Sequence, residues 1–104
     1  MKLDEQCMKD ILLYVSEHIK VKVEKMNSNN IDIFSTNIST LLEKMSKEGK
    51  YTIEEIAYNL IQCHRYGYID IDIQYLNSHT IQSATSNIWG VTFAGIDFMN
   101  QYQN

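Results

Sequence analysis

The sequence predicts a single α+β domain, and three observations support that prediction. The chain has 104 residues, of which 44% are hydrophobic and 21% are charged, and these values are ordinary for a globular protein. Several segments repeat apolar residues with the period of an amphipathic helix. Other segments alternate apolar and polar residues, as half-buried antiparallel strands do. We therefore expect one domain over residues 1–104, with three to four helices and a small antiparallel β-sheet.

The first third of the chain predicts a helix followed by a hairpin. The helix runs from about Gln6 to Ile19, with Asp4 as its N-cap. Its apolar stripe has helical spacing and consists of Met8, Ile11, Leu12, Val15 and Ile19. Residues 20–24 alternate strictly, which predicts a strand with one polar face. The polar cluster 27–30 predicts a turn, and residues 31–34 predict a second short strand that pairs back on the first.

Two further helices are expected in the middle of the chain. Residues 38–47 carry an apolar stripe, and Gly49 follows where a left-handed residue would end a helix. Its stripe consists of Ile38, Leu41, Leu42 and Met45. The third helix spans residues 52–66 and opens with a capping box, Thr52-x-x-Glu55, before Gly67 ends it. Its expected buried face consists of Ile53, Ile56, Ala57, Leu60 and Ile61.

The last third predicts a hairpin and a closing helix. Residues 68–75 alternate isoleucine with acidic or amide side chains, which indicates a half-buried strand ending at Tyr75. Residues 76–87 are rich in Asn, Ser and Thr and predict a long loop or hairpin tip. Residues 88–91 predict the returning strand. Thr92 then caps a final helix, whose inward residues are expected to be Ile96, Met99, Phe93 and Tyr102.

The order of these elements is helix, strand, helix, helix, strand, strand, helix. A helix that ends at a glycine and leads directly into a β-hairpin is typical of the winged helix-turn-helix arrangement. The sequence therefore predicts a winged helix-turn-helix-like fold, although other α+β folds can use the same order.

Three stretches of the chain resemble a known family of uncharacterised bacterial and phage proteins, the domain of unknown function DUF2513. Residues 1–15 resemble the opening helix of that family. Residues 51–69 resemble its central helix, with Asn59 where the family usually has His. Residues 91–99 resemble its closing LTxxGHxFL motif, with Ile96 in the place of the usual His.

These three stretches cover about half of the chain, whereas residues 20–50 match the family poorly. The family has no established activity. The resemblance therefore implies a winged-helix-like fold and a phage or mobile-element setting, and it transfers no catalytic residue.

The outward face of the third helix is the first candidate site. It is expected to present Tyr58, Asn59, Gln62 and Arg65 beside Glu54, Glu55 and Tyr66. Asn, Gln and Arg are the side chains that make paired hydrogen bonds to base edges in the major groove of DNA. One interpretation is that this face reads double-stranded DNA; the other is an ordinary solvated polar face.

The charge distribution weighs against DNA binding. Residues 1–50 hold eight Lys and eight acidic side chains, whereas residues 51–104 hold only Arg65 and five acids. Phosphate neutralisation by Lys and Arg supplies most of the affinity of DNA-binding proteins. Contacts could come instead from the lysines of the first half, with Lys44 and Lys47 as the nearest candidates beside Lys20, Lys22, Lys25 and Lys50. Because those lysines alternate with acids, a solvated surface is the competing interpretation.

No recognised catalytic or metal-binding motif is present in the sequence. Cys7 and Cys63 are too few for a disulfide framework and lack CxxC spacing, which favours a reduced, cytoplasmic protein. Cys63 and His64 are adjacent on a helix and point about 100° apart, so they cannot form a catalytic pair there. We expect His64 to continue the buried stripe, and we expect no enzyme activity, no cofactor and no metal.

Two functions follow as hypotheses. The first is a small DNA-binding, transcription-regulating protein with helix 52–66 as its reader. The second is an acidic protein-interaction module of the same fold, an accessory phage factor without nucleic-acid affinity. Trp89, Phe93, Phe98 and Tyr102 are expected to pack inside, and any of them left exposed would mark a partner surface. The chain has no membrane-spanning segment, and a homodimer through the first and last helices is expected.

Overall fold

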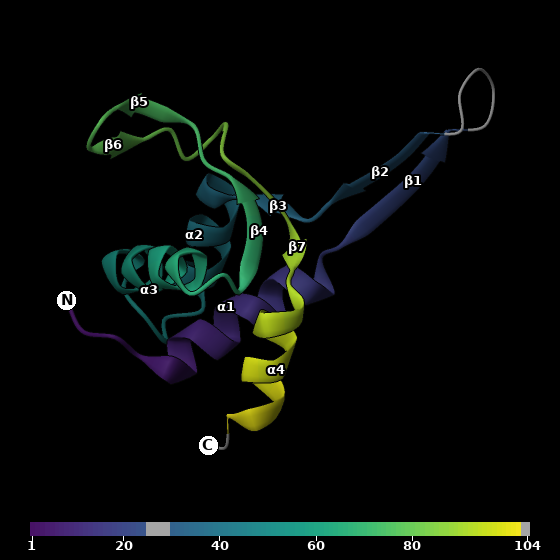
Figure 1. Cartoon of the computed structure of the whole chain (residues 1–104). Helices are drawn as coiled ribbons and strands as arrows, with labels where there is room; N and C mark the ends of the chain where they lie inside the picture. Colours follow the sequence, from purple (N-terminus) through teal and green to yellow (C-terminus); the bar gives the residue numbers. More distant parts are fainter. Residues whose placement is uncertain (25–29, 103–104) are drawn as a thin grey trace.

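A computed structural model describes residues 1–24 and 30–102 and shows an α+β protein (Figure 1). The predicted turn residues Asn27, Ser28 and Asn29 lie outside the described residues, as does Lys25. The helices and strands are α1 (Glu5–Glu17), β1 (Lys20–Glu24), β2 (Asn30–Phe34), β3 (Thr36–Asn37), α2 (Ile38–Lys47), α3 (Ile53–Arg65), β4 (Ile69–Asp72), β5 (Tyr75–Asn77), β6 (Thr80–Ile81), β7 (Asn87–Val91) and α4 (Phe93–Gln101).

The central sheet has three antiparallel strands in the order β3-β7-β4. The hairpin partners β4 and β7 were both expected, whereas the two-residue strand β3 was not. β3 lies between α1 and α2 in the sequence, yet it pairs with β7 near the end of the chain. This arrangement, with α2 and α3 preceding a β-hairpin, fits a winged-helix-like fold.

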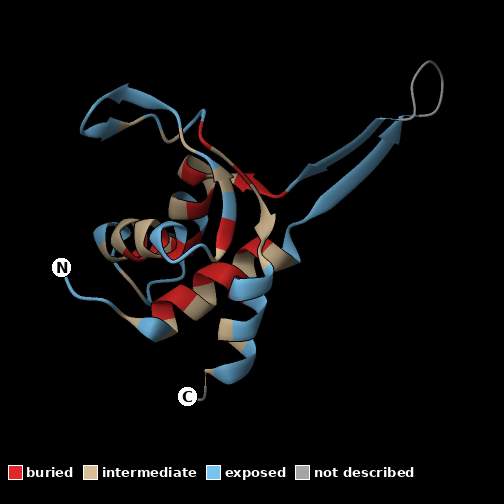
Figure 2. Cartoon of the chain, in the orientation of Figure 1, coloured by how far each residue is buried: buried red, intermediate tan, exposed pale blue. Residues whose placement is uncertain are grey.

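The core lies where α1, α2 and α3 pack together against this sheet (Figure 2). The α1 stripe is completely buried between Met8 and Val15, as its helical spacing predicted. Ile69 of β4 and Ile88 of β7 close the core from the sheet side. Burying such side chains is the main favourable contribution to folding.

The helix ends follow local capping chemistry. The side chains of Asp4, Asn37, Thr52 and Thr92 each accept a hydrogen bond from an amide in the first turn of their helix. Gly49 and Gly67 follow α2 and α3 with φ values of 77° and 75°, a left-handed conformation that favours glycine. Helix α1 is shorter than predicted: it ends at Glu17, and Ile19 lies outside it with an exposed side chain.

Two helices are rotated relative to the prediction. In α3 the buried residues are Ile56, Asn59, Leu60 and Cys63, while Ile53 is 46% exposed. The inward positions are Ile56 and the residues three, four and seven places after it. Ile53 is exposed because it lies in the first turn of the helix, at the edge of the inward face, and His64 points about 100° away from Cys63. The predictions that Ile53 and His64 are buried are wrong.

In α4 the side chain of Phe93 is 88% exposed and Ile96 is also exposed, so their predicted inward positions are wrong. Gly95 is buried instead, and Phe98 and Met99 pack against the core. The close approach of Gly95 to the backbone of Tyr68 determines this rotation.

Two hairpins extend from the body (Figure 1). The predicted strand 68–75 is shorter than expected: β4 ends at Asp72, and Tyr75 belongs to the exposed hairpin β5–β6, which the prediction described as a hairpin tip. The other hairpin, β1–β2, projects on the opposite side, and we call residues 20–24 and 30–34 the arm. The radius of gyration is 14.4 Å, larger than the about 13 Å of a compact domain of this length. The projecting hairpins explain the excess.

Candidate binding surfaces

The accessible face of α3 is the surface that the sequence predicted to read DNA. The capping box at its start is complete: Thr52 Oγ1 accepts from the Glu55 amide at 3.1 Å, and the Glu55 carboxylate accepts from the Thr52 amide at 2.9 Å. This cap and the burial of Ile56 and Leu60 determine which side chains of α3 face outward. The position of each α3 side chain relative to the outward face follows from these contacts.

Asn59 does not belong to that face. Its side chain is 1% exposed, its Oδ1 accepts a hydrogen bond from the Asp4 amide at 2.9 Å, and its Nδ2 donates to the Glu55 carbonyl at 2.9 Å. Because Asp4 is the N-cap of α1, Asn59 joins α3 to the start of α1. The prediction that Asn59 lies on the outward face of α3 is wrong, since both ends of its amide are bonded inside the protein.

Tyr58, Gln62 and Arg65 do share the accessible face of α3. They are spaced four and three residues apart, so their side chains follow one another along the helix. Tyr58 and Gln62 are half-buried, and Arg65 is exposed. Glu54 is exposed at the start of the same helix. The face therefore presents one guanidinium and no other cation with a permanent charge.

Lys44 and Lys47 lie on α2 rather than beside the α3 face. Lys47 forms an exposed ion pair with Glu43, with 3.1 Å between Nζ and Oε1. Lys44 lines a groove to which no α3 residue contributes. The predicted nucleic-acid contacts therefore fall on two different elements, and the structure does not bring them together into one basic surface.

Lys50, another lysine considered for DNA contact, is bound to Asp10. Lys50 Nζ lies 3.0 Å from Asp10 Oδ2, and the Tyr51 hydroxyl donates to the same oxygen at 2.6 Å. Burial raises the pKa of Asp10, but the hydrogen bonds from Tyr51, Lys50 and Gln6 outweigh it and hold that pKa below its usual value. This cluster ties the α2–α3 connection to α1.

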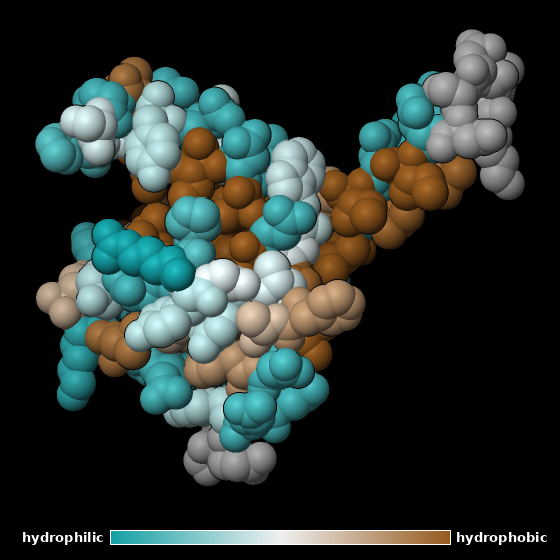
Figure 3. Space-filling view, viewed as in Figure 1, coloured by the Kyte–Doolittle hydropathy of each residue, from teal (hydrophilic) through white to brown (hydrophobic). Residues whose placement is uncertain are grey.

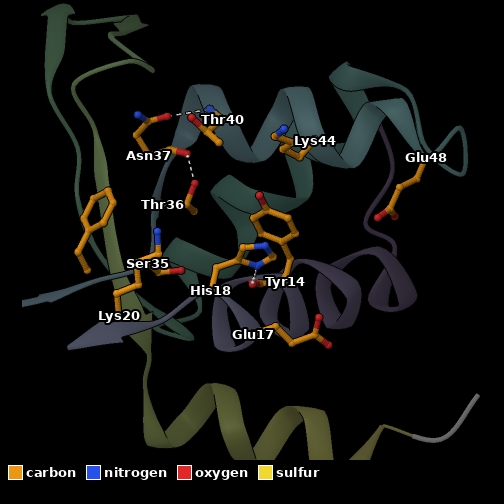
Figure 4. A pocket seen from close by; sticks show the side chains of 11 residues that line it. Tyr14, Glu17, His18, Lys20, Ser35, Thr36, Asn37, Thr40, Lys44 and Glu48 are labelled. Carbon is orange, nitrogen blue, oxygen red and sulfur yellow. Dashed lines mark hydrogen bonds between the residues drawn. The ribbon is translucent and has the colours of Figure 1, made fainter. Parts of the chain in front are cut away.

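The groove beside Lys44 has a volume of about 570 Å³ (Figure 4). It lies between the end of α1, the foot of the arm and one side of α2, from Asn37 to Glu48. Lys20 and Lys44 supply its positive charge, and Glu17 and Glu48 balance it. The groove therefore has no electrostatic preference for an anion.

Several polar side chains of the groove form hydrogen bonds or stacking contacts within the protein. The imidazole of His18 stacks on Tyr14 at 4.0 Å between ring centroids, and its Nδ1 lies 2.7 Å from the Tyr14 carbonyl oxygen. Ser35 Oγ donates to the Val15 carbonyl at 2.8 Å. Thr36 Oγ1 donates to the Asn37 carbonyl at 3.1 Å (Figure 4). The bond from Ser35 holds the segment before α2 against the end of α1.

Both cysteines are buried and unbridged. Burial is the main cause that raises the pKa of each thiol, from 9.0 to about 12. Cys63 Sγ lies 3.9 Å from the Met8 carbonyl oxygen, whereas His64 points to solvent. Among residues 1–24 and 30–102, no group of three or more His, Cys, Asp or Glu side chains is placed to hold a metal ion.

We expect Cys7 and Cys63 to react slowly with iodoacetamide in the folded protein. The thiolate is the reacting species, and a pKa near 12 leaves very little of it at pH 8. Alkylation at pH 8, followed by mass spectrometry, should be at least about tenfold slower than in the urea-unfolded chain. Equal rates in the two states would contradict the burial of both thiols.

The arm carries an exposed apolar face. Residue types alone did not reveal that this face is left uncovered. Val21 and Val23 of β1 pair with Ile33 and Ile31 of β2, so the four side chains lie on one face. Each remains 50–62% exposed. Figure 3 shows hydrophobic surface along one side of the arm and hydrophilic surface along the other. The alternation predicted the hairpin, but it could not show that none of the residues 1–24 and 30–102 covers the apolar face.

At its foot the arm is fixed to the body by aromatic packing. The rings of Phe34 and Trp89 meet edge-on, with 6.0 Å between their centroids. Ile19, just before β1, lies over Gly90 of β7: a Cβ built on that glycine would be 3.8 Å from Ile19 Cδ1. The apolar face therefore starts at the body and continues outward along the arm.

Comparison with known proteins adds no relative: no family, no curated protein and no solved structure matches this chain. The resemblance to DUF2513 stays a prediction from the sequence. In the described part of the chain, every helix is too short or too polar to cross a membrane.

Proposed function

We propose that this protein is a protein-interaction module in which a winged-helix-like body carries the arm as its contact surface. The observation that supports this proposal is the apolar face of Val21, Val23, Ile31 and Ile33, which no described element of the chain covers. Contiguous exposed apolar surface on a small protein marks a site of protein contact. The arm provides such a surface at a distance from the body, where a partner can reach it.

The charge distribution supports the same proposal. Residues 51–104, which include α3 and both hairpin strands β4 and β7, carry one Arg and five acids. Residues 75–87, where the hairpin β5–β6 lies, contain neither Lys nor Arg. A surface that binds the DNA backbone needs several such cations, because the release of counterions from phosphates supplies the affinity.

DNA binding by a transcription-regulating protein is the second candidate function. The observation that favours it is the common accessible face of Tyr58, Gln62 and Arg65 on α3. Gln and Arg can each make paired hydrogen bonds to a base edge. The loss of Asn59 from this face leaves two such readers instead of three.

Titration of the protein with random-sequence duplex DNA at about 50 mM and about 200 mM salt separates the two functions. We expect no binding at either salt concentration. Binding that weakens steeply with salt would overturn the proposal, since it would demonstrate several phosphate contacts. In that case Arg65→Glu, compared with Lys44→Glu and Lys47→Glu, would show whether α3 or α2 faces the DNA.

A further inference from the structure

We propose that the apolar face of the arm is a dimerisation surface, on which the same face of a second copy of this chain packs. This inference deepens the proposed function and rests on it, because it names the partner of the arm. It requires three things of the arm: a face suited to burial, a charge that permits two copies to meet, and enough area.

The pattern of the arm is that of a sheet with one buried face. On one face of the hairpin Val21 pairs with Ile33 and Val23 pairs with Ile31. The opposite face carries Lys20, Lys22, Glu24, Asn30 and Asp32, with Phe34 at the foot of the arm beside Lys20. Such a division between an apolar and a polar face is typical of antiparallel sheets that pack on a core. In the arm, the apolar face remains exposed, and no described part of the chain packs against it.

An isolated two-stranded hairpin is at best marginally stable in water. The ten described residues of the arm nevertheless form five consecutive cross-strand pairs. Packing a second layer against the apolar face would supply the missing burial, because two sheets stack face to face at about 10 Å with their apolar side chains between them. The arm of a second copy offers a layer of the same length and shape.

The charge of the arm favours a neutral partner. Lys20 and Lys22 are balanced by Glu24 and Asp32 among the described residues of the arm. With Lys25, residues 20–34 carry a net charge of only +1, so a nucleic acid or an anionic membrane gains little attraction from this segment. Two copies can approach arm to arm with little repulsion there, although each whole chain carries a charge of −4.

The area is sufficient for a reversible dimer. The four β-branched residues, with Ile19 at the foot of the arm, expose roughly 400 Å² of apolar surface in each copy. Two such faces and the polar rim that surrounds an interface reach the about 1,000 Å² that a specific interface needs. A two-fold axis between the arms makes the contact self-complementary, as in most homodimers.

Sedimentation equilibrium over about 1–200 µM protein tests the dimer. We expect the mass to rise from 12.2 kDa towards twice that value. The variant Val23→Thr with Ile31→Thr makes the apolar face polar while keeping β-branched side chains, and it should weaken dimerisation at least about tenfold. The matched control, Lys22→Thr with Asp32→Thr, changes the opposite face at the same depth of the arm, leaves the net charge unchanged, and should dimerise like the unmodified chain.

A second measurement does not depend on the stability of the double variants. Cysteine is placed singly at each of the four apolar positions and, as a control, at Lys22. Copper-phenanthroline with dissolved oxygen oxidises two neighbouring thiols to a disulfide. A covalent dimer is expected from at least one apolar position and not from Lys22→Cys, because Lys22 lies on the opposite face of the arm. The native Cys7 and Cys63 are buried and should not form crosslinks between copies.

An unmodified chain that stays monomeric to about 200 µM overturns the dimer, as does equal weakening by the two double variants. Crosslinking at Lys22→Cys as efficient as at the apolar positions also overturns it. These results would contradict only the second copy as partner. The proposed function fails on a different result, steep salt-dependent binding to DNA.

Discussion

The substitution Gly95→Ala is expected to destabilise the protein by about 3 kcal/mol, although in an exposed helix the same change stabilises by about 1 kcal/mol. Gly95 is buried in the first turn of α4, where the helix crosses the connection between α3 and β4. A Cβ at this position would overlap the carbonyl oxygen of Tyr68 and lie 2.6 Å from Cγ1 of Val91.

The backbone of Tyr68 has little freedom to move away. Its carbonyl oxygen accepts a hydrogen bond from the Thr92 amide at 3.0 Å, and its amide donates to the Cys63 carbonyl at 2.9 Å. Its ring also stacks on Phe98, with 4.9 Å between centroids. The added methyl group must therefore displace α4 from the sheet, and the overlap outweighs the gain in helix propensity.

Urea unfolding followed by circular dichroism measures this effect. Ala94→Gly is the matched control, because Ala94 is the exposed neighbour of Gly95 on the same helix. That change should cost about 1 kcal/mol, the ordinary difference in helix propensity. A Gly95→Ala protein more stable than the unmodified chain would show that α4 does not pack closely on Tyr68.

Local signals in the sequence were sufficient for most of the body. Thr52 and Glu55 located the start of α3, and Gly49 and Gly67 located the ends of α2 and α3, because capping depends on neighbouring residues alone. The α2 boundaries agree with the prediction at both ends. The strand β3 was missed because its two residues carry no period of their own and are defined by pairing with β7, about fifty residues away.

The rotation of a helix is harder to predict than its position. In α4, apolar residues occur at almost every position from Phe93 to Met99, so hydrophobic spacing alone does not decide which face is buried. The contact of Gly95 with Tyr68 decides it, and that contact joins two elements that are distant in sequence. The arm presents the same difficulty on a larger scale: alternation predicts which side chains share a face, while only the whole fold shows whether anything covers that face.

Asn59→Ala is expected to reduce the free energy of unfolding by about 2 kcal/mol, and Gln62→Ala, on the accessible side of the same helix, by less than about 0.5 kcal/mol. Removing the Asn59 amide leaves the Asp4 amide without its partner inside the protein and detaches the start of α1 from α3. Urea unfolding of both variants measures the difference. Equal losses would contradict the interior position of Asn59 and return it to the candidate DNA-reading face.

The variant Asn59→Asp tests the two hydrogen bonds of Asn59 separately, because the bond to the Glu55 carbonyl requires a protonated carboxyl and the bond from the Asp4 amide does not. The new carboxyl oxygen can still accept from the Asp4 amide, but a carboxylate cannot donate to the Glu55 carbonyl as the amide Nδ2 does. Burial beside that carbonyl raises the pKa of the new carboxyl in the folded state above its unfolded value of about 3.9. The variant should therefore match the unmodified chain most closely below about pH 4, where the protonated carboxyl can donate, and fall further behind as the pH rises to 7. A deficit that grows with pH would show that the site rejects a carboxylate, as the burial of Asn59 and the adjacent Glu55 carbonyl predict. A deficit that does not change with pH would contradict the burial of this side chain.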